Sequence, residues 1–72
     1  MPRLVRISYR ELAAKLRHAG YFEIRTGRHP VYYLAAGNVT IPVPQHPGDV
    51  PIGTLRAIVR EMGVSVEEFN AL

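Results

Sequence analysis

The apolar positions in the first third of the chain recur at helical spacing. Leu12 and Leu16 fall on one face of a helix, a pattern typical of an amphipathic helix. Ser8 and Glu11 have the three-residue spacing of a capping box just before it. Gly20 stands where a left-handed residue commonly ends a helix. The pattern therefore predicts a short helix that begins near Ser8.

The pattern then changes to the two-residue alternation of a β-strand. Within residues 21–26, Phe22 and Ile24 fall on one side, and Glu23 and Arg25 fall on the other. This alternation predicts a first strand with Arg25 facing away from Phe22.

Two further strands follow. Residues 31–36 are rich in side chains that favour a pleated surface, which predicts a second strand. Gly37-Asn38 tolerates positive φ at both positions and predicts a two-residue turn into an antiparallel third strand, residues 39–41. Pro42 and Pro44 cannot donate ladder hydrogen bonds, which places the third strand at a sheet edge.

The last third is predicted to be helical after a loop over residues 44–51. Gly63 ends a segment with helical apolar spacing, and Ser65 and Glu68 repeat the capping-box spacing before a short helical tail. The apolar positions of the segment are Leu55, Ile58, Val59 and Met62. The order is α-β-β-β-α, an α+β fold with two helices on one face of a three-stranded sheet. With 72 residues, we expect one domain spanning 1–72.

Composition narrows the function classes. The chain has no cysteine, which excludes disulfides, thiolate zinc sites and a cysteine nucleophile. Apolar residues make up 47% of the chain and argue against disorder. No segment resembles a secretory signal or approaches the roughly 20 apolar residues of a membrane span. We therefore expect a soluble cytoplasmic protein.

The basic charge is concentrated in the N-terminal half. Residues 1–36 hold seven of the nine Lys and Arg residues and two of the six acidic ones. Such asymmetry suits a protein that binds a polyanion, because Lys and Arg release counterions when they contact phosphates. The alternative is a solvated surface that happens to be basic.

His29 is the main candidate for chemistry. It precedes the second strand, beside Arg28 and near Arg25 in the sequence. A neutral imidazole can take a proton from a ribose 2′-hydroxyl, and guanidinium groups can stabilise the additional negative charge at the phosphorus. RNA cleavage of this kind needs no metal. The alternative is an ordinary surface histidine in a turn.

Other histidines are weaker candidates. His46 lies between prolines and is a candidate for the second acid or base, or for phosphate binding; alternatively it caps loop backbone. A metal site of His29, His46 and Asp49 matches no known ligand spacing, so we expect no metal or other cofactor. His18, in the last turn of the first helix, suits the helix dipole.

Several residues are candidates for RNA contact. Lys15 and Arg17 on the first helix extend the basic sequence around Arg25 and Arg28. Adjacent tyrosines in the second strand point to opposite faces, so one fills the core and the other can stack on a base. The pattern does not decide between them, and Tyr32 is taken as the RNA-binding candidate.

Five short motifs, in this order and spacing, resemble the HicA or YcfA-like family of toxins over nearly the whole chain. They are Gly20-Tyr21, Gly27-Arg28-His29, Val43-Pro44-Gln45-His46, Gly53-Thr54-Leu55-Arg56 and Ser65-Val66-Glu67-Glu68-Phe69. The resemblance implies a double-stranded-RNA-binding-domain-like fold, cleavage of messenger RNA that arrests translation, and neutralisation by a HicB antitoxin. It also implies that His29 is the active histidine.

One departure from the family is visible. The family often has Gly-Ser-His where this chain has Gly27-Arg28-His29, so a serine hydroxyl is absent. Arg28 then contacts phosphate, or activity is reduced.

Three functions remain open at this point. The first is a metal-independent ribonuclease with His29 as general base or acid, and an antitoxin that covers it. The second is a non-catalytic RNA-binding module that recognises shape and phosphates. The third is a docking protein whose main ligand is the antitoxin. A homo-oligomer is compatible with the sequence and is not predicted by it.

Overall fold

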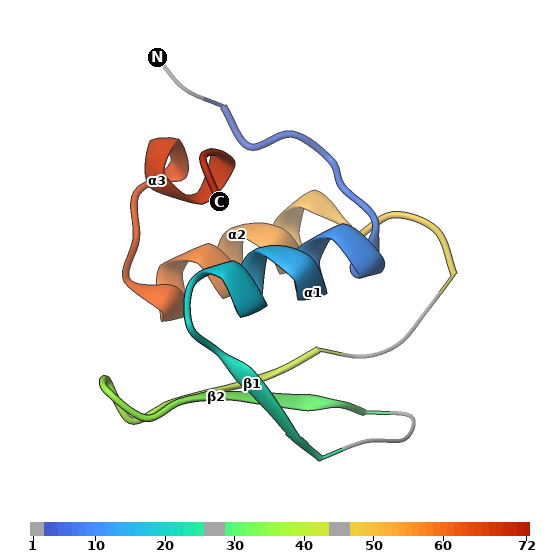
Figure 1. Cartoon of the computed structure of the whole chain (residues 1–72). Helices are drawn as coiled ribbons and strands as arrows, with labels where there is room; N and C mark the ends of the chain where they lie inside the picture. Colours follow the sequence, from blue (N-terminus) through green and yellow to red (C-terminus); the bar gives the residue numbers. More distant parts are fainter. Residues whose placement is uncertain (1–2, 26–28, 44–46) are drawn as a thin grey trace.

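The three strands form one antiparallel sheet, and the first two helices cover one of its faces (Figure 1). The computed structural model of the chain describes residues 3–25, 29–43 and 47–72. The strand order is β1-β2-β3. The α-β-β-β-α order with a helical tail is confirmed and defines an α+β fold of the double-stranded-RNA-binding-domain type. The elements are α1 (Tyr9–His18), β1 (Phe22–Arg25), β2 (Val31–Leu34), β3 (Val39–Pro42), α2 (Ile52–Met62) and α3 (Val66–Asn70).

The ends of α1 and α2 follow the local sequence. Ser8 Oγ accepts a hydrogen bond from the Glu11 amide at 3.1 Å, and a Glu11 carboxylate oxygen accepts one from the Ser8 amide at 3.3 Å. Gly20, with φ of 100°, and Gly63, with φ of 73°, take the left-handed conformation just after the two helices. Because L side chains disfavour this conformation, glycine suits both positions. The predicted helix boundaries are confirmed.

The turn between β2 and β3 is longer than predicted. Leu34 pairs with Val39, so the turn contains the four residues 35–38, and the prediction of a two-residue turn at Gly37-Asn38 is wrong. A tight turn of the expected type needs positive φ at both central residues. Asn38 has φ of 52°, whereas Gly37 is not among the positive-φ glycines. The Asn38 amide instead donates to the carbonyl of Ala35 at 3.3 Å.

A β-bulge in β1 changes which side chains share a face. Phe22 pairs with Tyr33, and Arg25 pairs with Val31, so three positions along β1 correspond to two along β2. The register shifts between Glu23 and Arg25. Val31 and Tyr33 are two residues apart on β2, so their side chains point to the same side of the sheet. Their partners Arg25 and Phe22 therefore also lie on one face. The prediction that these two residues face opposite sides is wrong.

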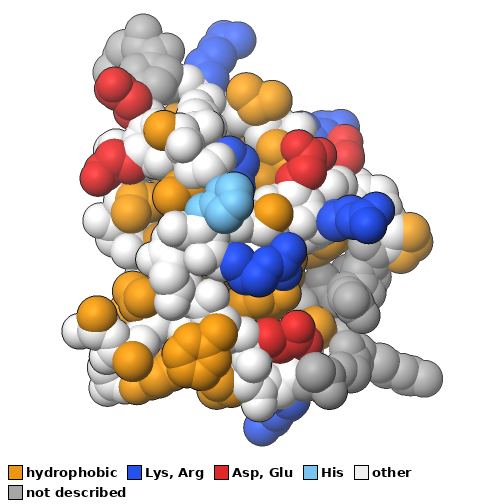
Figure 2. All heavy atoms as spheres, viewed as in Figure 1, with side chains coloured by type: hydrophobic (Ala, Val, Ile, Leu, Met, Phe, Trp, Pro, Cys, Tyr) orange, Lys and Arg blue, Asp and Glu red, His pale blue; other side chains and the backbone are white. Residues whose placement is uncertain are grey.

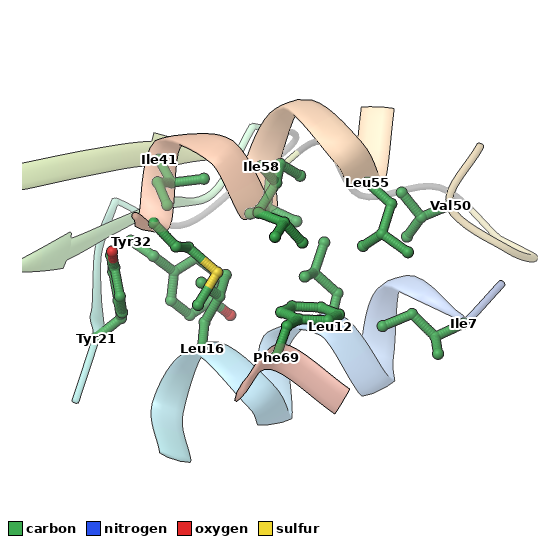
Figure 3. Close-up of a cluster of buried hydrophobic side chains, with 13 residues drawn as sticks. Ile7, Leu12, Leu16, Tyr21, Tyr32, Ile41, Val50, Leu55, Ile58 and Phe69 are labelled. Atoms are coloured by element: carbon green, nitrogen blue, oxygen red, sulfur yellow. The ribbon is translucent and has the colours of Figure 1, made fainter. Parts of the chain in front are cut away.

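The core lies between the helices and the covered face of the sheet, where the labelled side chains point toward one another (Figure 3). The segment before α1 joins the segment before α2 through a hydrogen bond from the Val50 amide to the Ile7 carbonyl, at 2.8 Å. The described part of the chain contains no helix long and apolar enough to cross a membrane. The buried apolar residues are Ile7, Leu12, Leu16, Tyr21, Tyr32, Ile41, Val43, Val50, Leu55, Ile58, Val59, Met62 and Phe69.

Candidate functional site

His29 is exposed at the end of the sheet, two residues before β2 begins. The next residue, Pro30, is buried, and its carbonyl accepts a hydrogen bond from the amide of Val43 at 2.8 Å. Val43 is itself part of the core. The exposed imidazole thus stands next to a backbone position, Pro30, that packing and a hydrogen bond hold in place. An anchored neighbour suits a group that must meet a substrate in a fixed geometry.

Arg25 lies at the same end of the β1–β2 hairpin as His29. It is the last residue of β1, it is exposed, and it pairs with Val31, two residues after His29. The structure therefore places a guanidinium group and an imidazole at one end of the sheet. Two other candidates of this region, Arg28 and His46, lie outside the described residues.

Lys15 has contacts that the sequence did not indicate. Its ammonium group donates hydrogen bonds to the carbonyls of Phe69 at 3.2 Å, Asn70 at 3.3 Å and Leu72 at 3.2 Å. These carbonyls belong to the end of α3 and the residues after it, where helix carbonyls lack partners within the helix. The contacts give Lys15 a structural role that competes with contact to RNA.

Arg17 is exposed in the last turn of α1, as is His18. Because α1 packs on the covered face of the sheet, the structure separates Arg17 and Lys15 from the open face that carries Arg25. In the view of Figure 2, Lys and Arg side chains (blue) are interspersed with Asp and Glu (red). The basic candidates among the described residues thus do not form one continuous surface.

The two tyrosines of β2 divide between the core and the open face. Tyr32 is 4% exposed and belongs to the core, so the expectation that Tyr32 contacts RNA is wrong. Tyr33 lies on the open face and is half-buried. Its ring makes a T-shaped contact with the ring of Phe22, with centroids 5.8 Å apart and planes at 87°. Phe22 was missed as a site residue, because only the register of β1 on β2 shows that the two rings meet.

A shallow groove on another part of the molecule includes none of the candidate residues. It lies between the N-terminal segment, α2 and α3. The Asn70 side chain joins α3 to the N-terminal segment by donating a hydrogen bond to the Arg3 carbonyl at 2.8 Å. Within residues 3–25, 29–43 and 47–72, no three His, Asp or Glu side chains gather as metal ligands would. The groove is lined by Arg3, Leu4, Ile52, Arg56, Val59 and Val66.

The fold and the exposed histidine before β2 define a small α+β domain of the double-stranded-RNA-binding-domain type. The family model described as the HicA toxin of bacterial toxin-antitoxin systems matches residues 9–64. This match covers most of the chain, so the chain belongs to the HicA toxin family. A toxin of this kind is paired with an antitoxin, which is therefore the partner that family membership implies. A comparison with curated proteins found no match.

Proposed function

We propose that this toxin is a metal-independent endoribonuclease that cleaves messenger RNA and so blocks translation. The observation that carries the proposal is the exposed His29 next to the anchored Pro30, with Arg25 at the same end of the sheet, in a chain of the HicA family. An imidazole and a guanidinium together supply the two functions that cleavage needs, which are proton transfer and stabilisation of charge.

In the proposed reaction, His29 takes the proton of a ribose 2′-hydroxyl. The 2′-oxygen then forms a bond to the adjacent phosphorus, and the bond between phosphorus and the 5′-oxygen breaks. The leaving 5′-oxygen takes a proton, for which His46 is the proposed donor. The products are a 2′,3′-cyclic phosphate and a 5′-hydroxyl end. Arg25 and Arg28 hold the phosphate and stabilise its additional negative charge.

A HicB-type antitoxin is the proposed inhibitor. To block both binding and chemistry, it covers His29 together with Arg25 and Arg28. A structure of the complex in which the His29 imidazole stays exposed to solvent contradicts this part of the proposal.

The test is growth arrest after induced expression of the wild type, His29→Ala and His18→Ala, with cellular RNA examined for new ends. His18 is the matched control because it is also an exposed histidine among the described residues. We expect arrest, together with new 5′-hydroxyl ends in messenger RNA, for the wild type and for His18→Ala. Both effects are absent in His29→Ala.

Two outcomes contradict the proposal. Arrest with intact messenger RNA in the wild type favours a non-catalytic module that binds RNA. Cleavage that persists in His29→Ala removes His29 from the reaction. A thermal unfolding curve of purified His29→Ala checks that the variant is folded, which we expect because the His29 side chain is outside the core.

A further inference from the structure

We propose that the open face of the sheet binds an unpaired RNA base on the Phe22–Tyr33 ring pair and the adjoining phosphate on Arg25. The inference rests on the proposed function in that RNA is the substrate, and it adds how the substrate is held and which form is preferred. The register places six β-strand residues on the side of the sheet that points away from the helices. They are Phe22, Arg25, Val31, Tyr33, Thr40 and Pro42.

The ring pair has the geometry of a stacking surface. Phe22 is 51% exposed, although large apolar side chains are usually covered. Tyr33 is held in place, because its hydroxyl donates a hydrogen bond to the Asn38 side-chain oxygen at 3.3 Å. In a T-shaped pair, one ring meets its partner through its edge, so the partner ring does not cover the faces of that ring. A third flat ring can therefore stack there.

The charge on this face favours RNA over a protein partner. The β-bulge places Arg25 on the same side as Phe22. Glu23, which supplies the single carboxylate of the three strands, pairs with Tyr32 and hence belongs to the other side. An aromatic pair beside a guanidinium, with no acid from the strands, is the combination that single-stranded nucleic acids require.

The positions along β2 connect this surface to His29. Val31 and Tyr33 are about 7 Å apart along the strand, and Arg25 lies opposite Val31. His29 precedes Val31 by two residues. RNA with one base on the ring pair therefore has its backbone running past Arg25 toward His29. Since duplex bases are already stacked on both faces, this surface selects unpaired RNA.

The test measures binding of the full chain to fluorescein-labelled 2′-O-methyl oligouridylate. This probe lacks a free 2′-hydroxyl, so the proposed mechanism cannot cleave it. Phe22→Leu is expected to weaken binding by roughly 5- to 150-fold, the equivalent of about 1–3 kcal/mol for one stacked base. Phe22→Tyr keeps a ring and is expected to restore wild-type affinity. Val5→Ala is the matched control, because Val5 is 64% exposed and lies outside the sheet.

The dependence on salt separates stacking from phosphate contact. Arg25→Ala is expected to reduce the slope of log affinity against log salt by about 1. Phe22→Leu is expected to leave this slope unchanged, because it removes no charge. We expect Phe22→Leu and the wild type to have equal affinity for a 2′-O-methyl duplex of the same length.

Three results overturn the proposal. Equal affinity of the wild type and Phe22→Leu for the single strand contradicts base stacking on Phe22. If Phe22→Leu loses as much affinity for the duplex as for the single strand, the preference for unpaired RNA is contradicted. A Phe22→Leu change that weakens binding to the antitoxin and leaves RNA affinity unchanged identifies a protein interface instead. None of these results depends on cleavage by His29, so the stacking surface and the ribonuclease mechanism can fail separately.

Discussion

The ammonium group of Lys15 lies 5.3 Å from the centre of the Phe69 ring and also donates a hydrogen bond to the carbonyl of Phe69 at 3.2 Å. One side chain of α1 thereby contacts both the ring and the backbone of α3. A helix of five residues is not stable by itself. Its position depends on the burial of Phe69 and on contacts such as this one.

Substitution of Lys15 by Ala is expected to destabilise the protein. Loss of charge-assisted hydrogen bonds and of a cation–π contact at a partly exposed site costs about 1–2 kcal/mol. For a chain of this size, the melting temperature falls by roughly 4–16 °C, measured by circular dichroism. Arg17→Ala is the control, because it removes the same charge from an exposed position of the same helix. Equal losses in the two variants contradict a structural role for Lys15.

Replacement of Tyr21 by Phe is expected to leave stability unchanged or to raise it. Tyr21 is 4% exposed, and its hydroxyl oxygen finds no hydrogen-bond partner in the described part of the chain. Since an unpaired buried polar group is unfavourable, its removal raises the free energy of unfolding by up to about 1–2 kcal/mol. Urea denaturation measures this change. Tyr33→Phe, which removes an exposed hydroxyl that donates to Asn38, is expected to lower stability slightly.

Because of the Tyr21 hydroxyl, we expect the folded protein to lose stability in alkali. Burial, and secondly the negative charge of Glu61, raise the pKa of Tyr21 above its ordinary value of 10.0. The unfolded chain therefore releases this proton at a lower pH than the folded chain. The contribution of the neutral Tyr21 hydroxyl to the stability of the fold is complete below pH 10.0. It is lost as the pH rises through the pKa of Tyr21 in the folded chain. The stability of the wild type is expected to fall more steeply above pH 10.0 than that of Tyr21→Phe, and parallel curves contradict this.

Glu68 predicts a loss of stability in acid. Its carboxylate accepts a hydrogen bond from the Ser65 amide at 2.9 Å, and this bond, followed by the Ser65 side chain, holds the pKa of Glu68 below its ordinary value of 4.5. The contribution of the charged Glu68 carboxylate to the stability of the fold is present above pH 4.5. It is lost as the pH falls through the lowered pKa of Glu68. In Glu68→Gln the corresponding loss is expected to be absent, whereas Glu67→Gln, one residue away, keeps it. Urea denaturation at a series of acidic pH values compares the three proteins.

The two capping boxes show which parts of the fold local sequence predicts. Ser65 and Glu68, like Ser8 and Glu11, satisfy each other within three residues, so their spacing alone specifies where a helix begins. Gly63 likewise ends α2 through its own backbone conformation. These features were predicted correctly because no distant residue is involved.

The faces of the strands could not be predicted in this way. The side on which Arg25 lies depends on its pairing with Val31 across a bulge, and simple alternation assigns the wrong side. The choice between Tyr32 and Tyr33 depends on which face the helices cover, and this is a property of the whole fold. His29 was selected by local chemistry and by the family resemblance, and its role stays a prediction.

Two glycines in the motifs shared with the family are expected to respond oppositely to substitution by Ala. Gly20 has φ of 100°, and an added Cβ would lie 3.3 Å from Leu34 Cδ1, so Gly20→Ala is expected to lose about 1–2 kcal/mol. Gly53 lies in the first turn of α2 with nothing within 4 Å of an added Cβ, and Gly53→Ala is expected to gain about 0.5 kcal/mol. Thermal unfolding of both variants measures the difference. A destabilised Gly53→Ala shows that α2 does not gain from the higher helix propensity of alanine, while an unchanged Gly20→Ala shows that the chain accepts a side chain after α1.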